Sequence, residues 1–332
     1  MNPSKESLIY GLKKVKEAWW WILPASLYIP IGGFIFWFLG FTIAKWLYNP
    51  DILEKLNFST FRTLLWENPF SMGNYKTFAS VLATTFLMYL ILYFFTGYLP
   101  SKKAANKNHS RLMLNVTVWY FVLYILLALI CNALIKLNIH SKNIILNFAL
   151  NELFKNICRT TFGAIGYITI AFISYMREDF SIKHVFYAVL ILIGVEILKV
   201  LTISLPTAMS TYGTNGPNTN TLFLKSGFVE TFIAWLLTIF GFFEISTTLL
   251  YKNFFEGIKK GFLLIKNGWQ NILAYLLIYT LYIIAVATVR LAAHNNHSKI
   301  LYHYLIPVIL IFIVFFEIAS ILRLAEIYHK KL

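Results

Sequence analysis

Long apolar runs, separated by short polar segments, fill most of this chain. A helix needs roughly 20 mainly apolar residues to cross about 30 Å of hydrocarbon. Backbone groups in lipid must find hydrogen-bond partners within the segment, so such runs predict transmembrane helices. We predict an all-α, polytopic bundle of about eight spans, over residues 19–44, 77–99, 112–135, 160–176, 185–206, 228–250, 271–293 and 300–322.

The fourth predicted span is the weakest, because its 160–176 run is short and contains Gly163 and Gly166. Without it, every later segment would change sides, and the lysine-rich 252–266 stretch would face outward. Basic residues favour the cytoplasmic side, so we retain the span. No domain linker interrupts the pattern, and residues 1–332 are predicted to form a single transmembrane domain.

Composition and charge support a membrane location. Hydrophobic residues make up 58% of the chain and charged residues only 13%, which is unlike a water-soluble globule. The net charge of +15 would indicate nucleic acid in a soluble domain, but here it reflects topology, and we predict no nucleic-acid partner. Most basic residues face the cytoplasm if the N-terminus is inside. They lie in 5–16, 102–111, 177–183, 252–266 and 323–331.

These basic segments predict the inner, cytoplasmic membrane, with both termini in the cytoplasm. We expect the first apolar run to be retained as an anchor, because it is too long for a cleaved signal peptide and no small-residue cleavage site follows it. The sequence does not identify a protein partner.

An amphipathic helix is predicted ahead of the seventh span, over 252–268. Apolar residues recur there every three or four positions, and lysines cover the other faces. Such a helix lies in the headgroup layer, so a bilayer with anionic headgroups is the predicted partner. A second amphipathic stretch, 146–157, is expected on the outer side. The apolar stripe of the first helix contains Phe254, Ile258, Phe262, Ile265 and Trp269.

Two internal echoes mark the chain. The N-terminus repeats the amphipathic design at an offset of 250, so that Lys16 and Trp19 match Lys266 and Trp269. The segment Phe242–Thr247 recurs as Phe315–Ser320, near the cytoplasmic end of another span. The echoes indicate either a duplicated hairpin or the common design of any interfacial helix that leads into a span.

These features resemble certain uncharacterised bacterial multi-pass proteins. They are also similar to the membrane domain attached to some glycerophosphodiester phosphodiesterases. The resemblance rests on Lys16–Trp19, Lys266–Trp269 and the hydroxyl-rich Ser246–Tyr251, so it covers only the ends of the chain. The catalytic barrel of those enzymes is absent, and the resemblance therefore implies a membrane fold and no activity.

Charged residues inside spans are the candidate functional residues, because burying a charge at mid-bilayer costs at least about 2.5 kcal/mol. Glu196 and Lys199 stand at i, i+3 in the fifth span and can pair. Glu244 and Glu317 lie near the cytoplasmic ends of their spans. The three glutamates form either a proton or cation relay with Lys199 as counter-charge, or structural contacts with hydroxyl groups of neighbouring helices.

Histidines and cysteines each leave two interpretations open. His294, His297 and His303 cluster around the last outer loop and are either zinc ligands or a polar turn; we favour the turn, because no Glu or Cys accompanies them. Cys131 and Cys158 are either bonded outside the cell or unpaired small residues. We predict no metal and no cofactor.

Motifs of soluble enzymes are missing: the sequence has no phosphate loop, HExxH, GxSxG or CxxC. We therefore predict a non-enzymatic membrane or accessory component with no catalytic residue. The alternative is a secondary transporter of a small solute through a path lined by the three glutamates. A lipid-modifying enzyme is a third hypothesis, supported only by the histidine loop and the outer amphipathic helix.

Overall fold

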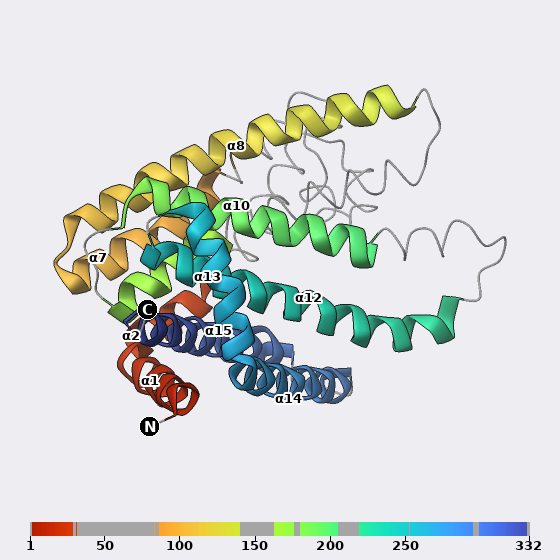
Figure 1. The fold of residues 1–332 in the computed structure, drawn as a ribbon. Coiled ribbons are helices and arrows are strands. Elements are labelled where there is room, and N and C mark those ends of the chain that lie inside the picture. The colour runs from red at the N-terminus through yellow and green to blue at the C-terminus, as the bar shows by residue number, and fades with distance from the viewer. Residues whose placement is uncertain are drawn as a thin grey trace.

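Helices make up the described part of the chain (Figure 1). The structure is a computed structural model that describes residues 2–28, 31, 83, 86–139, 163–175, 180–204, 219–251, 253–294 and 299–330. These residues form helices and the turns that join them, with no strand among them. The all-α class is confirmed.

Two π-helical turns, η2 and η3, accompany the α-helices in the described ranges. A further apolar helix without a label spans Gly163–Tyr175. The labelled elements are α1 (Pro3–Glu17), α2 (Trp19–Ser26), η2 (Phe94–Tyr98), α7 (Leu99–Ala104), α8 (Lys107–Ile139), α10 (Ile182–Lys199), η3 (Val200–Ser204), α12 (Thr219–Tyr251), α13 (Phe254–Asn267), α14 (Trp269–His294) and α15 (Lys299–His329).

Four helices among the described residues are long and apolar enough to cross a membrane. They correspond to the fifth, sixth, seventh and eighth predicted spans. This is the helix content of a membrane protein. The four segments are Ile182–Ile203, Val229–Tyr251, Trp269–Thr288 and Leu305–His329.

The predicted count of about eight spans is not supported. Pro24 lies inside α2, which ends at Ser26, and the rest of the first predicted span to residue 44 is outside the described residues apart from 27, 28 and 31. Most of the second predicted span is also outside them as far as residue 85. The third lies within the long helix α8, which is not one of the four.

Within the fourth predicted span, the structure describes a helix over Gly163–Tyr175. This described part rises about 20 Å at 1.5 Å per residue. Nearly all of its side chains are buried, among them Tyr167, Ile168 and Phe172. A helix that is apolar on all sides is buried, either in a protein core or in a membrane, and the described part of this helix lies in the core of the bundle.

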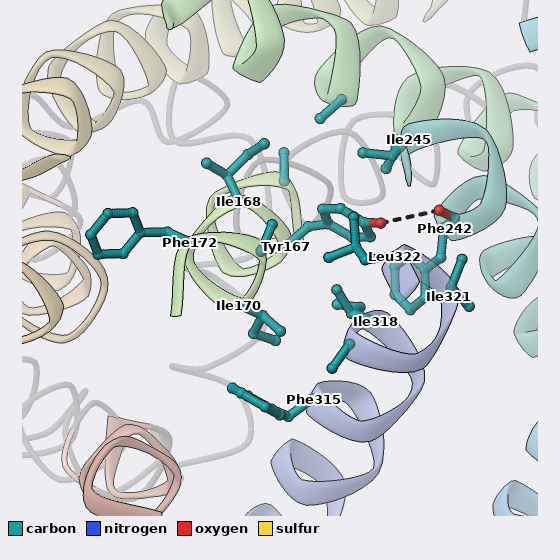
Figure 2. Close-up of a cluster of buried hydrophobic side chains, with 14 of the residues drawn as sticks. Tyr167, Ile168, Ile170, Phe172, Phe242, Ile245, Phe315, Ile318, Ile321 and Leu322 are labelled. Atoms are coloured by element: carbon teal, nitrogen blue, oxygen red, sulfur yellow. Dashed lines mark hydrogen bonds between the residues drawn. The ribbon is translucent and has the colours of Figure 1, made fainter. Parts of the chain in front are cut away.

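The main core lies where this short helix meets α12 and α15 (Figure 2). Tyr167 points from the short helix toward α12 and donates a hydrogen bond to the carbonyl oxygen of Phe242 at 3.2 Å. Phe315 and Ile318 of α15 are buried in the same cluster. A tyrosine buried in this way needs such a partner for its hydroxyl.

The π-helical turn η2 ties several helices together. A π-turn interrupts the regular α-helical ladder and leaves carbonyl groups available to other partners. The carbonyl of Phe95 accepts the indole N–H of Trp21 at 2.8 Å. The carbonyl of Thr96 accepts bonds from His109 at 3.0 Å and from Thr169 at 3.3 Å. Three separate helices are therefore anchored on two successive carbonyls.

Helix ends that are far apart in sequence meet at one end of the molecule, where Figure 1 marks both termini. The hydroxyl of Tyr10 in α1 donates to the carbonyl of Ser174, at the end of the short helix, at 3.1 Å. The rings of Tyr251 and His329, at the ends of α12 and α15, lie 4.5 Å apart. The predicted alternation of spans requires these ends to lie on the same side.

Candidate functional site: buried glutamates and two interfacial helices

Small residues form much of the inner face of α1 and α13, the two helices that the sequence predicts to lie at the membrane interface. The buried residues of α13 are Gly257, Gly261 and Leu264, and this face packs against α12. Small residues allow two helix backbones to approach closely. The predicted apolar stripe is divided: Phe254 and Ile265 pack against the core, whereas Phe262 is 65% exposed and Trp269 is 55% exposed. The equivalent inner face of α1 consists of Ser4, Ser7, Gly11 and Val15, and it packs against α15.

The two internal echoes of the sequence come together in two similar helix pairs, α13 with α12 and α1 with α15. In α12, the Thr247 hydroxyl donates to the carbonyl of Gly257 in α13 at 2.8 Å. In α15, Ser320, the echo of Thr247, lies directly against Gly11 of α1. Each copy therefore consists of an interfacial helix that is packed on the span carrying the repeated segment. Because one copy joins the two ends of the chain, its helices follow in permuted order.

An ion-pair cluster that sequence reasoning missed fastens α1 to α15. The guanidinium of Arg323 donates to Glu6 at 2.7 Å and to Glu326 at 2.8 Å. It also lies 5.5 Å from the centre of the Tyr10 ring. Burial raises the pKa of Tyr10 above its ordinary value, against the effect of the nearby Lys14. No local pattern predicts the pairing of Glu6 with Arg323, because 317 positions separate them.

Glu196 and Lys199 are joined on one face of α10. The ammonium group of Lys199 lies 2.5 Å from a carboxylate oxygen of Glu196, at the i, i+3 spacing expected from the sequence. Both side chains are largely buried. Lys199 therefore neutralises Glu196 within its own helix.

Glu244 of α12 packs beneath α13. Its carboxyl group lies against the backbone of Gly261, where any larger side chain would displace it. Neither oxygen has a hydrogen-bond partner, and the residue is buried. Glu244 therefore occupies the space left by a glycine at the contact of the interfacial helix with its span.

Glu317 of α15 is the most enclosed of the three glutamates, with 0% of its surface exposed and no hydrogen-bond partner for either oxygen. The indole N–H of Trp235 in α12 is close enough to act on the carboxyl group, but the pair does not reach hydrogen-bond geometry. Tyr275 and Tyr279 of α14 also interact electrostatically with it. Glu317 therefore sits where three helices meet.

A buried polar chain runs from α1 to the neighbourhood of Glu317. The side-chain amide of Asn271 lies 2.8 Å from the Ser7 hydroxyl and 3.2 Å from the Tyr275 hydroxyl. All three residues are fully buried. The chain connects an interfacial helix to Tyr275, which is itself a neighbour of Glu317.

In the described residues, no direct contact joins the three glutamates of the predicted relay to one another. Among the described residues, Lys199 alone forms an ion pair with any of Glu196, Glu244 and Glu317, and no hydrogen bond links two of these glutamates. The relay therefore stays a prediction.

His109, at the start of α8, is a buried polar residue that sequence reasoning did not select. Its ring stacks on Phe172 with centroids 3.7 Å apart. Its Nε2 bonds to the Thr96 carbonyl, so this nitrogen carries the proton of the neutral ring. Burial lowers the pKa of His109 to about 4. The only signal in the sequence was its place beside the third predicted span.

Several predictions fall outside the described residues. They concern the outer amphipathic stretch 146–157, the side chains of Cys131 and Cys158, and the histidines. His294 and His303 belong to helices, but their side chains are not described, and His297 is outside altogether. In the part of the chain that the structure describes, no three His, Cys, Asp or Glu side chains are grouped to hold a metal ion.

Comparison with known protein families, with curated proteins and with solved structures gave no match.

Proposed function

We propose that this chain is a multi-pass integral protein of the inner, cytoplasmic membrane, with a non-enzymatic role as a membrane or accessory component. One observation carries the proposal: the outward face of α14 is a continuous apolar stripe. Its residues are 55–62% exposed and recur at helical spacing. Water would disfavour such a surface, whereas lipid accommodates it. The stripe consists of Leu273, Leu277, Leu281 and Ile284.

The shared position of the helix ends supports cytoplasmic termini. The segments that meet at this end carry most of the lysines of the described residues, including Lys102 and Lys103 of α7 and Lys259 and Lys260 of α13. The positive-inside rule assigns that end to the cytoplasm.

The outer surface of α13 supports anionic lipid as the partner. Phe255, which is 80% exposed, projects from the bundle together with Phe262, and Lys259 and Lys266 are exposed beside them. Aromatic rings with neighbouring lysines suit the boundary between acyl chains and anionic headgroups. In this arrangement the glycine face holds α13 to α12 while the aromatic face enters the lipid.

The resemblance to the membrane domain of glycerophosphodiester phosphodiesterases is part of this proposal. Its two KxxW segments each lie at a junction of helices: Lys16–Trp19 joins α1 to α2, and Lys266–Trp269 joins α13 to α14. A membrane role without the catalytic barrel agrees with both junctions.

Reporter fusions test the location and the sidedness. We expect green fluorescent protein to fluoresce when it is fused after residue 252 or after the C-terminus, and alkaline phosphatase to be inactive there. Alkaline phosphatase inserted at 295–298 should be active, because the proposed topology places the connection between α14 and α15 outside the cell. The reverse pattern, or recovery of the chain in the soluble fraction, would contradict the proposal.

A secondary transporter is the second candidate, and the burial of Glu317 without a counter-charge favours it. Buried intramembrane carboxyl groups are typical of proton and ion pathways. Purified protein in liposomes should then move protons or a small solute, and the Glu244→Gln/Glu317→Gln double variant should abolish that flux. A double variant that merely loses thermal stability, with no flux in the wild type, supports the structural interpretation instead.

A further inference from the structure

We infer that Glu317 is a proton-binding site formed by α12, α14 and α15, and that the proton is its ligand. The inference rests on the bilayer placement of α15 proposed above. It deepens the transport candidate by selecting one of the three glutamates and by identifying the ion that this glutamate takes.

Glu317 has no counter-charge among the described residues. Glu196 already has a cation, Lys199, at 2.5 Å, whereas none of the ion pairs in the described residues includes Glu317. An isolated carboxylate in an apolar interior has a large desolvation cost, and a buried carboxyl group usually becomes neutral instead. The resting state of Glu317 is therefore the carboxylic acid.

The surroundings of the Glu317 carboxyl group limit which cation can bind there. The rings of Trp235 and Tyr279, two residues that interact with Glu317, stack with centroids 4.0 Å apart and planes 4° from parallel. An organic cation cannot enter between rings at van der Waals contact. A hard metal ion would need several oxygen ligands. The described site offers the carboxyl group of Glu317 itself and the hydroxyls of Tyr275 and Tyr279. The proton is the cation that fits.

The carboxylate form of Glu317 must be energetically accessible if the proton is to exchange. The groups facing Glu317 are all potential hydrogen-bond donors: the Trp235 indole of α12 and the Tyr275 and Tyr279 hydroxyls of α14. The indole nitrogen has no other partner. After the proton leaves, a small movement would let this N–H donate to the carboxylate, and charge-assisted hydrogen bonds are about twice as strong as neutral ones.

A buried hydrogen-bonded chain connects the surroundings of Glu317 to α1. Tyr275 is bonded to Asn271, and Asn271 to Ser7 of α1. The carboxyl group is thus next to a buried hydrogen-bonded chain that ends on an interfacial helix. Glu244, its counterpart in the internal echo, has the Gly261 backbone in place of aromatic donors.

Infrared spectroscopy of the full chain in anionic liposomes tests the inference, because the carbonyl stretch of a protonated carboxyl group is distinct from carboxylate bands. At pH 7 we expect Glu317→Gln to remove one such band and Glu196→Gln to remove none. In deuterated buffer the wild-type band should shift, which shows that the proton exchanges. A band that is unchanged in Glu317→Gln, or one that never shifts in deuterated buffer, would overturn the proposal.

A second pair of variants leaves the glutamate in place and covers the case in which Glu317→Gln does not fold. Trp235→Phe removes the N–H that would stabilise the carboxylate after the proton leaves, so the band of the protonated carboxyl group should persist to higher pH than in the wild type. Trp119→Phe alters an outward-facing residue of α8, 63% exposed, and should leave the band alone. Equal spectra for these two variants at every pH would contradict the site geometry. An exchanging band without any liposome flux would refute transport and leave the proton site standing.

Discussion

Single buried polar side chains carry much of the specificity of this molecule. His109 shows how: its Nε2–H is committed to the Thr96 carbonyl, and its ring lies against Phe172 with planes 6° from parallel. Its Nδ1 is buried with no partner. A proton added at Nδ1 would place an unpaired charge inside the packed end of the bundle, which is strongly unfavourable.

The sign of the resulting pH dependence follows from the low pKa. His109 has a pKa of about 4 in the folded protein, against 6.5 ordinarily, so the unfolded chain binds the proton more tightly. The free energy of unfolding should be greatest above pH 6.5 and should fall by about 3 kcal/mol as the pH drops to 4. Thermal unfolding in detergent at pH 7.5 and pH 4.5 measures this loss.

Replacing the imidazole separates His109 from the other titrating groups. His109→Gln should flatten the pH dependence, since the glutamine amide keeps a donor for the Thr96 carbonyl and does not titrate. His329→Gln, at an exposed position, should leave the wild-type dependence intact. If both variants have the wild-type slope, the buried imidazole is not its source.

At the scale of elements, the repeated contact between an interfacial helix and a span organises the bundle. A side chain at Gly257 would place its Cβ 2.6 Å from the Cα of Thr248, so the backbones of α13 and α12 must move apart to admit it. The contact at Gly261 is softer, because the obstructing group is the end of the Glu244 side chain.

Alanine at Gly257 tests this contact. The overpacked crossing should lower the free energy of unfolding by about 1–2 kcal/mol, even though alanine favours the helix. Gly194→Ala in α10 is the matched control, because no heavy atom lies within 4 Å of the added methyl group. That variant should be neutral or more stable by up to about 1 kcal/mol. Equal effects on thermal unfolding in the two variants would disprove the close approach.

At the scale of the whole molecule, contacts between distant segments bring helix ends to one side. The Arg323–Glu6 ion pair joins the two termini, and Asn271 joins α14 to α1. The bundle contains two similar helix pairs, α13 on α12 and α1 on α15, and the second pair forms only when the two ends of the chain meet. The fusion and flux experiments above examine the molecule at this scale.

The sequence by itself determined the helical class, the membrane-like composition and, from residue 182 onward, the four helices that are long and apolar enough to cross a membrane. Apolar runs of sufficient length have few alternatives in lipid, so a local pattern is enough to predict them. The internal echoes and the Glu196–Lys199 pair were also within reach, because spacing along a helix fixes which side chains can meet.

Tertiary structure alone decided which apolar helix is core and which faces outward. Hydropathy does not distinguish the enclosed helix Gly163–Tyr175 from one that crosses lipid, and it predicted more spans than the described residues support. The surroundings of Glu317 and His109 likewise depend on residues from other helices. Burial and pairing across hundreds of positions are properties of the packed bundle, and no local run of residues encodes them.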